Sequence, residues 1–251
     1  MKTGIILQAR TGSTRLPGKM TMDFFQGKTI LDILLERLTD HFPALPIVVA
    51  TTVNERDQAM VDAAERNGVA SFRGSEEDVL QRFVDAAQHF SLSHVVRICA
   101  DNPMLSPSLL KELLNAWGEG KTDYCSYQLP DGTPTIRSHY GLFAECVRTD
   151  ALEKVIASNH EAFFHEHVTN YLYNHPEQFQ LQFLPSPVVL NPYPQIRMTI
   201  DTAGDFENAG KVYRAFVEGG LEFNAENTVK VLQQQEGLLL AMNKEIIANS
   251  K

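Results

Sequence analysis

Short apolar runs alternate with amphipathic helical patterns through the first half of this chain. The runs of strand length lie at residues 4–8, 46–50, 70–72 and 94–98. Apolar residues at helical spacing follow at residues 29–39, 55–67, 75–90 and 106–117. Strands that alternate with helices in this way form a parallel sheet covered on both faces. The predicted fold class is therefore α/β, with an open, mostly parallel sheet.

The pattern changes after about residue 123. Strands are predicted at residues 123–126, 179–184 and 195–199, the second of them at a sheet edge. Helices are predicted at residues 150–158, 161–174, 205–218 and 225–235. Prolines and an Asp-Gly pair between residues 128 and 140 indicate a hairpin or excursion. Because no repeat or linker is evident, we expect one domain over residues 1–251, with residues 123–195 as an embellishment on its sheet.

The first predicted strand leads into a loop rich in cations and glycines. Residues 9–19 read Ala-Arg-Thr-Gly-Ser-Thr-Arg-Leu-Pro-Gly-Lys. Ligands of open α/β sheets bind at the carboxyl ends of strands, and this set of side chains suits a polyphosphate. A basic surface turn is the alternative interpretation. A Walker A loop is excluded because five residues separate Gly12 from Gly18 and Met20 follows Lys19, and the third glycine of G-x-G-x-x-G is missing.

Composition limits the partners and the compartment. A net charge of −9 disfavours a nucleic-acid partner, which requires a broad basic surface. Cys99, Cys125 and Cys146 lack C-x-x-C spacing, so free thiols are expected rather than a zinc site or disulfides. No apolar run reaches the length of a membrane span, and the first eight residues are too short for a secretory signal. We therefore expect a cytoplasmic protein without a membrane partner.

Two aspartates follow predicted strands at the edge where the cationic loop lies. Asp101 ends the segment Val-Val-Arg-Ile-Cys-Ala-Asp, and Asp201 follows the predicted strand 195–199. One or two carboxylates together with substrate phosphates commonly hold magnesium (Mg²⁺), so the pair can converge on one cation. The alternative for Asp101 is that it begins a turn or caps the helix that starts at Ser106. Asp205 is expected to be the N-terminal charge of its helix rather than a ligand.

Two other segments carry candidate binding residues. Arg73 and Gly74 end a predicted strand, and Ser75 is the expected N-cap of the next helix, where free N–H groups can bind an anion or the edge of a base. Asp78 is either part of that site or only a capping partner. His165 and His167 are two apart on a predicted helix and face different sides, which argues against a zinc pair. They are candidates for a substrate contact, with a structural role for both as the alternative.

The motifs of the first loop resemble those of the sugar cytidylyltransferases, which activate eight- and nine-carbon keto-acid sugars as CMP conjugates. The closer resemblance is to the branch of spore-coat polysaccharide biosynthesis. Its motifs appear in order over about residues 4–215: Gln8-Ala9-Arg10, Ser13 to Lys19, Arg73-Gly74-Ser75 with Asp78-Val79-Leu80, Val96-Arg97-Ile98 with Asp101 and Pro103, Glu166-His167-Val168-Thr169, and Thr199-Ile200-Asp201.

The resemblance implies an open, Rossmann-like nucleotide-diphospho-sugar transferase fold and Mg²⁺-dependent transfer of CMP from CTP to a sugar. It implies a homodimer, with Phe143, Phe163 and Phe164 as candidates either for its contact or for the core. The residues that it implies for catalysis are Arg10, Arg15, Lys19 and Asp101. Those implied for nucleotide binding are Gln8, Ala9, Arg10, Gly12, Ser13, Lys19, Arg73, Gly74 and Ser75. Asp101 and Asp201 are implied as ligands of Mg²⁺, and Glu145, His165 and His167 as contacts of the acceptor.

The chain departs from the family pattern at two positions. Asn102 stands where relatives often have Cys, and His139 precedes Tyr140-Gly141 where relatives tend to show P-x-G-x-x-x-E, with Glu145 retained. The identity of the acceptor therefore stays open. Three other functions are possible for such a sequence: a sugar-1-phosphate nucleotidyltransferase, a glycosyltransferase and a non-catalytic nucleotide-binding module. The absence of a D-x-D motif at residues 101–103 disfavours the glycosyltransferase.

Overall fold

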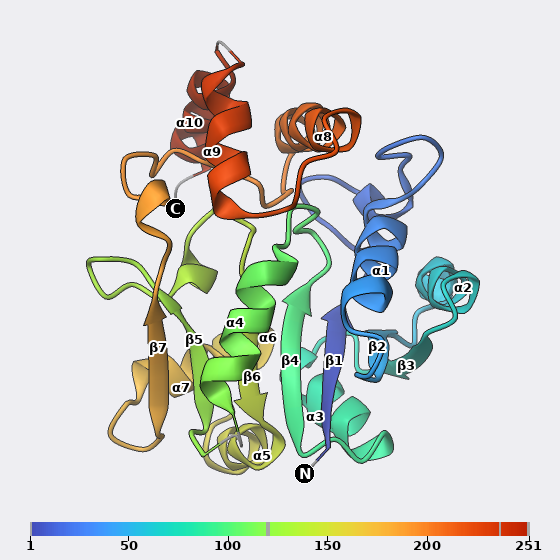
Figure 1. The fold of residues 1–251 in the computed structure, drawn as a ribbon. Coiled ribbons are helices and arrows are strands. Elements are labelled where there is room, and N and C mark those ends of the chain that lie inside the picture. Colours follow the sequence, from blue (N-terminus) through green and yellow to red (C-terminus); the bar gives the residue numbers. More distant parts are fainter. Residues whose placement is uncertain (1, 119–120, 236, 250–251) are drawn as a thin grey trace.

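A seven-stranded sheet runs through the centre of the computed structural model, which describes residues 2–118, 121–235 and 237–249 (Figure 1). Its strands stand in the order β3-β2-β1-β4-β6-β5-β7, and only β6 runs antiparallel to its neighbours. The strands are β1 (Thr3–Gln8), β2 (Ile47–Thr52), β3 (Ala70–Gly74), β4 (His94–Cys99), β5 (Tyr124–Gln128), β6 (Glu145–Arg148) and β7 (Leu181–Pro185). The predicted open, mostly parallel α/β sheet is confirmed.

Helices cover both faces of the sheet and its carboxyl edge. In Figure 1, α1 and α4 lie in front of the sheet, α3, α5 and α7 lie behind it, and α8 to α10 lie beyond the carboxyl ends of the parallel strands. The helices are α1 (Ile30–His41), α2 (Gln58–Arg66), α3 (Val79–His89), α4 (Pro107–Trp117), α5 (Thr149–Ser158), α6 (Ala162–Glu166), α7 (Asn170–Asn174), α8 (Ala203–Glu218), α9 (Ala225–Gln233) and α10 (Leu238–Asn249). No helix in the described ranges has the length and apolar composition that a membrane crossing needs.

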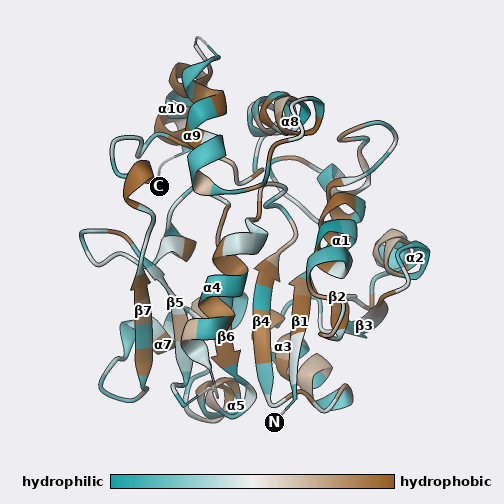
Figure 2. Cartoon of the chain, in the orientation of Figure 1, coloured by the Kyte–Doolittle hydropathy of each residue, from teal (hydrophilic) through white to brown (hydrophobic). Residues whose placement is uncertain are grey.

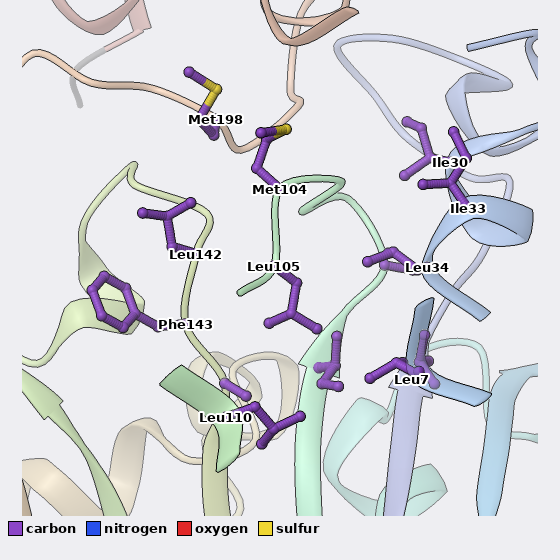
Figure 3. Packing of buried hydrophobic residues seen from close by; sticks show 14 of the residues in the cluster. Leu7, Ile30, Ile33, Leu34, Met104, Leu105, Leu110, Leu142, Phe143 and Met198 are labelled. Atoms are coloured by element: carbon purple, nitrogen blue, oxygen red, sulfur yellow. The ribbon is translucent and has the colours of Figure 1, made fainter. Parts of the chain in front are cut away.

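The core forms two layers, one on each side of the sheet. Hydrophobic residues concentrate along the central strands, while helices such as α4 show both hydrophobic and hydrophilic bands (Figure 2). The front layer includes Leu7, Leu34, Met104, Leu142 and Met198, all fully buried (Figure 3). It extends past the sheet edge to the segment that carries Met198. The core therefore also holds the loops that surround the carboxyl ends of the strands.

Local capping explains where several helices begin. Thr29 and Asp32 form a capping box at α1, and Thr202 and Asp205 form another at α8. Ser106 caps α4, whose first residue is a proline. The predicted role of Asp205 at the start of its helix is confirmed, because its carboxylate accepts hydrogen bonds from the N–H groups of residues 201 and 202.

Two predicted helices differ from the structure, and two elements were not predicted. The N-cap of α3 is Asp78, which accepts from the N–H of Gln81, because Ser75 instead caps the turn before it by accepting from the N–H of Asp78. The predicted helix 161–174 is broken into α6 and α7. The break lies at Val168, whose φ of 37° lies in the left-handed region and which is fully buried. Strand β6 and helix α10 were missed.

Residues 195–199 form no strand, contrary to prediction. The segment crosses the carboxyl edge of the sheet instead of joining it. The N–H of Met198 donates to the carbonyl of His139 at 2.8 Å, and the N–H of Ile200 donates to the carbonyl of Asp101 at 3.0 Å. These partners lie on two loops rather than on a neighbouring strand, so no ladder can form. Asp201 therefore reaches the sheet edge on an irregular segment.

Gly141 is the residue that lets this segment pack so closely. Its φ is +63°, and a Cβ there would lie 2.8 Å from the backbone carbon of Met198. Gly132 has a φ of +84° but nothing within 4 Å of such a Cβ. We expect Gly132→Ala to cost about 1 kcal/mol of the free energy of unfolding and Gly141→Ala about 3 kcal/mol, because overlap adds to the left-handed penalty. Urea denaturation measures both, and equal losses would contradict the packing argument.

Candidate active site

A cavity of about 560 Å³ opens at the carboxyl ends of β1 and β4. The strand order reverses between these two strands, which is the usual ligand position in open α/β sheets, and the volume suits a ligand pocket. The lining residues are Gln8, Ala9, Arg10, Gly12, Ser13, Thr14, Arg15, Lys19, Met20, Arg97, Cys99, Ala100, Asp101, Glu166, His167 and Asp201. A second hollow of about 420 Å³, beside Phe42 and Val69, has no charged side chain among its described lining residues. The first cavity is therefore the candidate active site.

The cationic loop is anchored by a carboxylate that the sequence did not reveal. Asp57, which is 1% exposed, accepts from both the N–H and the hydroxyl of Thr11, at 2.7 and 2.5 Å. It also accepts from the hydroxyl of Thr52. Burial alone would raise the pKa of Asp57, but these hydrogen bonds outweigh it and lower that pKa below its ordinary value. Asp57 thus stays ionised and holds the beginning of the loop against β2.

The three cations of the loop each face an acidic group across the cavity. The buried Nζ of Lys19 lies 3.0 Å from Oδ2 of Asp101 and 2.5 Å from the carbonyl oxygen of Ile200. Arg15 lies 2.7 Å from Oδ1 of Asp201. Arg10 lies 4.0 Å from Oε1 of Glu166. The cavity therefore brings together the loop and both strand-edge aspartates, with its charges largely balanced.

Asp101 and Asp201 have the donor chemistry and the placement that a magnesium site needs. Both line the cavity, and the backbone bond from Ile200 to Asp101 holds their segments together. Arg197 orients Asp201 by an Nη2 to Oδ2 contact of 3.1 Å and is itself clamped by both oxygens of Asp205. Within the described ranges no three acidic, His or Cys side chains form a complete metal cage. Two carboxylates fit Mg²⁺ when substrate phosphates supply further oxygens.

A buried polar network lies behind the inner end of the cavity. Arg97 of β4 donates through Nη1 to Oε2 of Glu145 at 2.5 Å. The hydroxyl of Tyr124 also donates to Glu145, and the hydroxyl of Thr169 lies 3.0 and 3.1 Å from its two oxygens. Glu145 is 1% exposed and does not line the cavity, whereas Arg97 does. The structure thus places Glu145 one layer behind the surface that a substrate would touch.

Several candidates lie outside the cavity lining. Arg73 donates to the carbonyls of Thr52 and Asn54 and to the side chain of Gln58. Gly74 packs against Arg82, and Ser75 caps the turn before α3. This segment meets the cavity only indirectly, where Arg10 lies 3.4 Å from the carbonyl oxygen of Glu76.

The two histidines have different surroundings. His167 lines the cavity beside Glu166, at the break between α6 and α7. His165 does not line it. Its Nδ1 lies 2.7 Å from Oδ2 of Asp78, and its Nε2 lies 2.9 Å from the carbonyl oxygen of Asn159. Both partners accept hydrogen bonds, so the arrangement favours the doubly protonated ring, which joins α6 to the start of α3.

We expect His165 to make stability depend on pH. Burial disfavours its charged form, but the bonds to Asn159 and Asp78 outweigh burial and raise the pKa of His165 above 6.5. Because the pKa of His165 is higher in the folded than in the unfolded protein, protonated His165 stabilises the fold below pH 6.5. This stabilisation is lost as the pH rises through the folded-state pKa. The difference in urea midpoint between the wild type and His165→Gln should therefore shrink between pH 5.5 and pH 9. In an Asp78→Asn background the difference should vary less with pH, and an unaltered pH dependence would contradict this origin.

Sequence reasoning assigned no role to Arg97, Cys99 or Glu166, all of which line the cavity. A signal existed for Arg97, since a charged residue inside an apolar strand needs a buried partner. The partner, Glu145, lies on a strand that the pattern did not predict. Burial raises the pKa of Cys99 to about 11, so its thiol is protonated near neutral pH and is no activated nucleophile.

Comparison with known proteins places these features in a family. A model of cytidylyltransferases matches residues 4–244. An uncharacterized protein of Methanocaldococcus jannaschii, MJ1063, is 40% identical over 82% of this chain and 81% of its own. The spore coat polysaccharide biosynthesis protein SpsF of Bacillus subtilis is 34% identical over 83% and 85%. The structure of a cytidylyltransferase from Leptospira borgpetersenii superposes with a TM-score of 0.82 at 28% identity, covering 100% and 98% of the two chains.

Proposed function

Because this chain belongs to the cytidylyltransferase family, we propose that it transfers CMP from CTP to a sugar hydroxyl with the help of Mg²⁺, releasing pyrophosphate. The acceptor that we propose is a keto-acid sugar of the octulosonate or nonulosonate type. One observation carries the proposal: a single cavity holds the three loop cations and both Asp101 and Asp201. This is the charge arrangement that a triphosphate with a divalent cation requires.

We assign the phosphates to Arg10, Arg15 and Lys19 and to the backbone at Gly12 and Ser13. These cations are paired with carboxylates in the free protein, so the triphosphate has to take over their hydrogen bonds. Gln8 and Ala9 line the same cavity and are assigned to the nucleoside. The segment 73–75 lies outside the cavity, and Glu76, which follows it, accepts a hydrogen bond from Arg10, so the role of this segment in the proposal is indirect.

In the proposed reaction, the acceptor hydroxyl attacks the α-phosphorus in line with the leaving pyrophosphate. The new bond joins the sugar oxygen to the CMP phosphorus, the α–β phosphoanhydride bond breaks, and the hydroxyl proton is released to solvent. Arg10, Arg15 and Lys19 neutralise the charge that gathers on the leaving pyrophosphate. Asp101 and Asp201 would hold Mg²⁺, which supplies Lewis-acid stabilisation of the phosphate oxygens.

The similarity to SpsF leads us to propose a role in surface polysaccharide biosynthesis, in the cytoplasm where CTP is available. We also propose that residues 1–251 form one catalytic domain, whose part at 123–195 supplies the acceptor side and the contact of a homodimer. Phe163 is the candidate for that contact, since its side chain is 55% exposed. Phe143 is buried in the front core layer and Phe164 packs against the rear layer, so both serve the core.

Pyrophosphate release tests the proposal directly. The four nucleoside triphosphates are crossed with keto-acid sugars and sugar-1-phosphates in the presence of Mg²⁺. Release with CTP and a keto-acid sugar is the expected result. Release only with a sugar-1-phosphate would instead assign the chain to sugar-1-phosphate nucleotidyl transfer. Binding of CTP without release across the panel would favour a binding module.

A further inference from the structure

The guanidinium of Arg97 has an edge that the protein does not use. Nη1 donates to Glu145, and Nη2 has only a 3.5 Å contact with Oε1 of Gln8. Nε is buried and has no hydrogen-bond partner among the described residues. Arg97 is only 7% exposed, so an N–H without a partner there carries a desolvation cost. Arg97 nonetheless lines the cavity, so its guanidinium borders the space that is open to a ligand.

This free edge has a defined chemical preference. Nε and Nη2 of an arginine present two parallel N–H groups, which match the two oxygens of a carboxylate. Glu145 occupies the other side of the guanidinium and is fixed by Tyr124 and Thr169. The side chain is therefore held in one orientation before any ligand arrives, which reduces the entropy lost on binding.

The position of Arg97 points to the acceptor rather than to the triphosphate. Its supporting residues come from β5, β6 and the turn before α7, all within residues 123–195, the part proposed to supply the acceptor side. The triphosphate already has three cations on the loop after β1. Asp101 follows the same strand as Arg97, so an acceptor held by Arg97 lies next to the proposed metal site.

We propose that Arg97 binds the carboxylate of the acceptor through Nε and Nη2, and that Glu145, Tyr124 and Thr169 position it. This rests on the proposed function. In a cyclic 2-keto-acid sugar the carboxylate and the reacting anomeric hydroxyl share one carbon. Fixing the carboxylate therefore fixes the nucleophile as well. Neutral sugars and sugar-1-phosphates lack this carboxylate, so Arg97 would select keto-acid sugars against them.

The test uses a double variant, since removing Arg97 alone would leave Glu145 buried without a counter-charge. Arg97→Gln with Glu145→Gln removes both charges and keeps polar groups in place. Arg214→Gln with Glu218→Gln is the matched control, because this pair is exposed and does not line the cavity. The probes are 3-deoxy-manno-octulosonate and N-acetylneuraminate, each beside its C1 methyl ester. Calorimetry measures their binding to each full-length protein in the presence of a non-hydrolysable CTP analogue.

We expect the wild type to bind at least one free acid about 10- to 100-fold more tightly than its methyl ester. The double variant should lose this preference, and the control variant should keep it. The affinity for the CTP analogue should be unchanged. Two results would overturn the proposal. The first is that the wild type binds neither acid more tightly than its ester. The second is that the double variant loses affinity for the CTP analogue or its selectivity for CTP over UTP, which would assign Arg97 to the cytosine base. Pyrophosphate release with a sugar that lacks a carboxylate would also overturn it while preserving nucleotidyl transfer.

Discussion

Asp101→Asn should lower turnover about 1000-fold while the fold survives. The substitution keeps the size and hydrogen-bonding capacity of the side chain but removes the charge that Mg²⁺ requires. Asp101 is 28% exposed and ends no regular element, so the protein should still unfold in one cooperative transition. The urea midpoint should fall, because the buried ammonium group of Lys19 loses its counter-charge. Steady-state pyrophosphate release and a urea titration measure the two effects separately.

The control for this variant is Asp150→Asn. Asp150 is a half-exposed aspartate that pairs with Arg148 and does not line the cavity. It should retain full activity. For Asp101→Asn we also expect a higher Mg²⁺ concentration at half-maximal rate, which distinguishes a metal ligand from a residue that only holds the loop. A variant with wild-type turnover and Mg²⁺ dependence would rule out the metal assignment.

Lys19→Met should lower kcat/KM for CTP by about 100- to 1000-fold. Lys19 is buried, and its ammonium group contacts both Asp101 and the backbone next to Asp201. The proposed transition state therefore loses a cation that is already in position, and the two aspartates lose the group that separates them. Methionine matches the length of lysine, so the packing around its methylene groups is kept.

The matched control is Lys28→Met, which removes a lysine paired with Glu36 at the surface. Its kcat/KM should equal that of the wild type. Calorimetric titration with CTP adds a second measurement, since the affinity of Lys19→Met for CTP should fall as well. Unchanged CTP affinity together with unchanged kcat/KM would show that Lys19 serves only to pair with Asp101.

Much of the fold followed from local patterns. The alternation of apolar runs and helical spacing predicted β1 to β4 and the helices between them, because burial on both faces of a parallel sheet imposes that pattern. The loop at residues 9–19 could be placed at the ligand-binding edge, since it directly follows a strand. One failure is local: Asp78 rather than Ser75 caps α3, because Ser75 caps the turn before it. Another failure lies where residues distant in the sequence decide the structure: the strand expected at 195–199 is replaced by bonds to two loops.

By itself, the sequence determined the sheet class, the cationic loop and the pair of aspartates that the proposal uses. Only the tertiary structure decided how these groups meet. Asp201 arrives on an irregular segment held by the carbonyls of His139 and Asp101, and Arg97 is fixed by a glutamate 48 residues away. Periodicity records which face of an element is buried, but it carries no information on which distant side chains will satisfy a buried charge. That choice depends on contacts that exist only after the chain has folded.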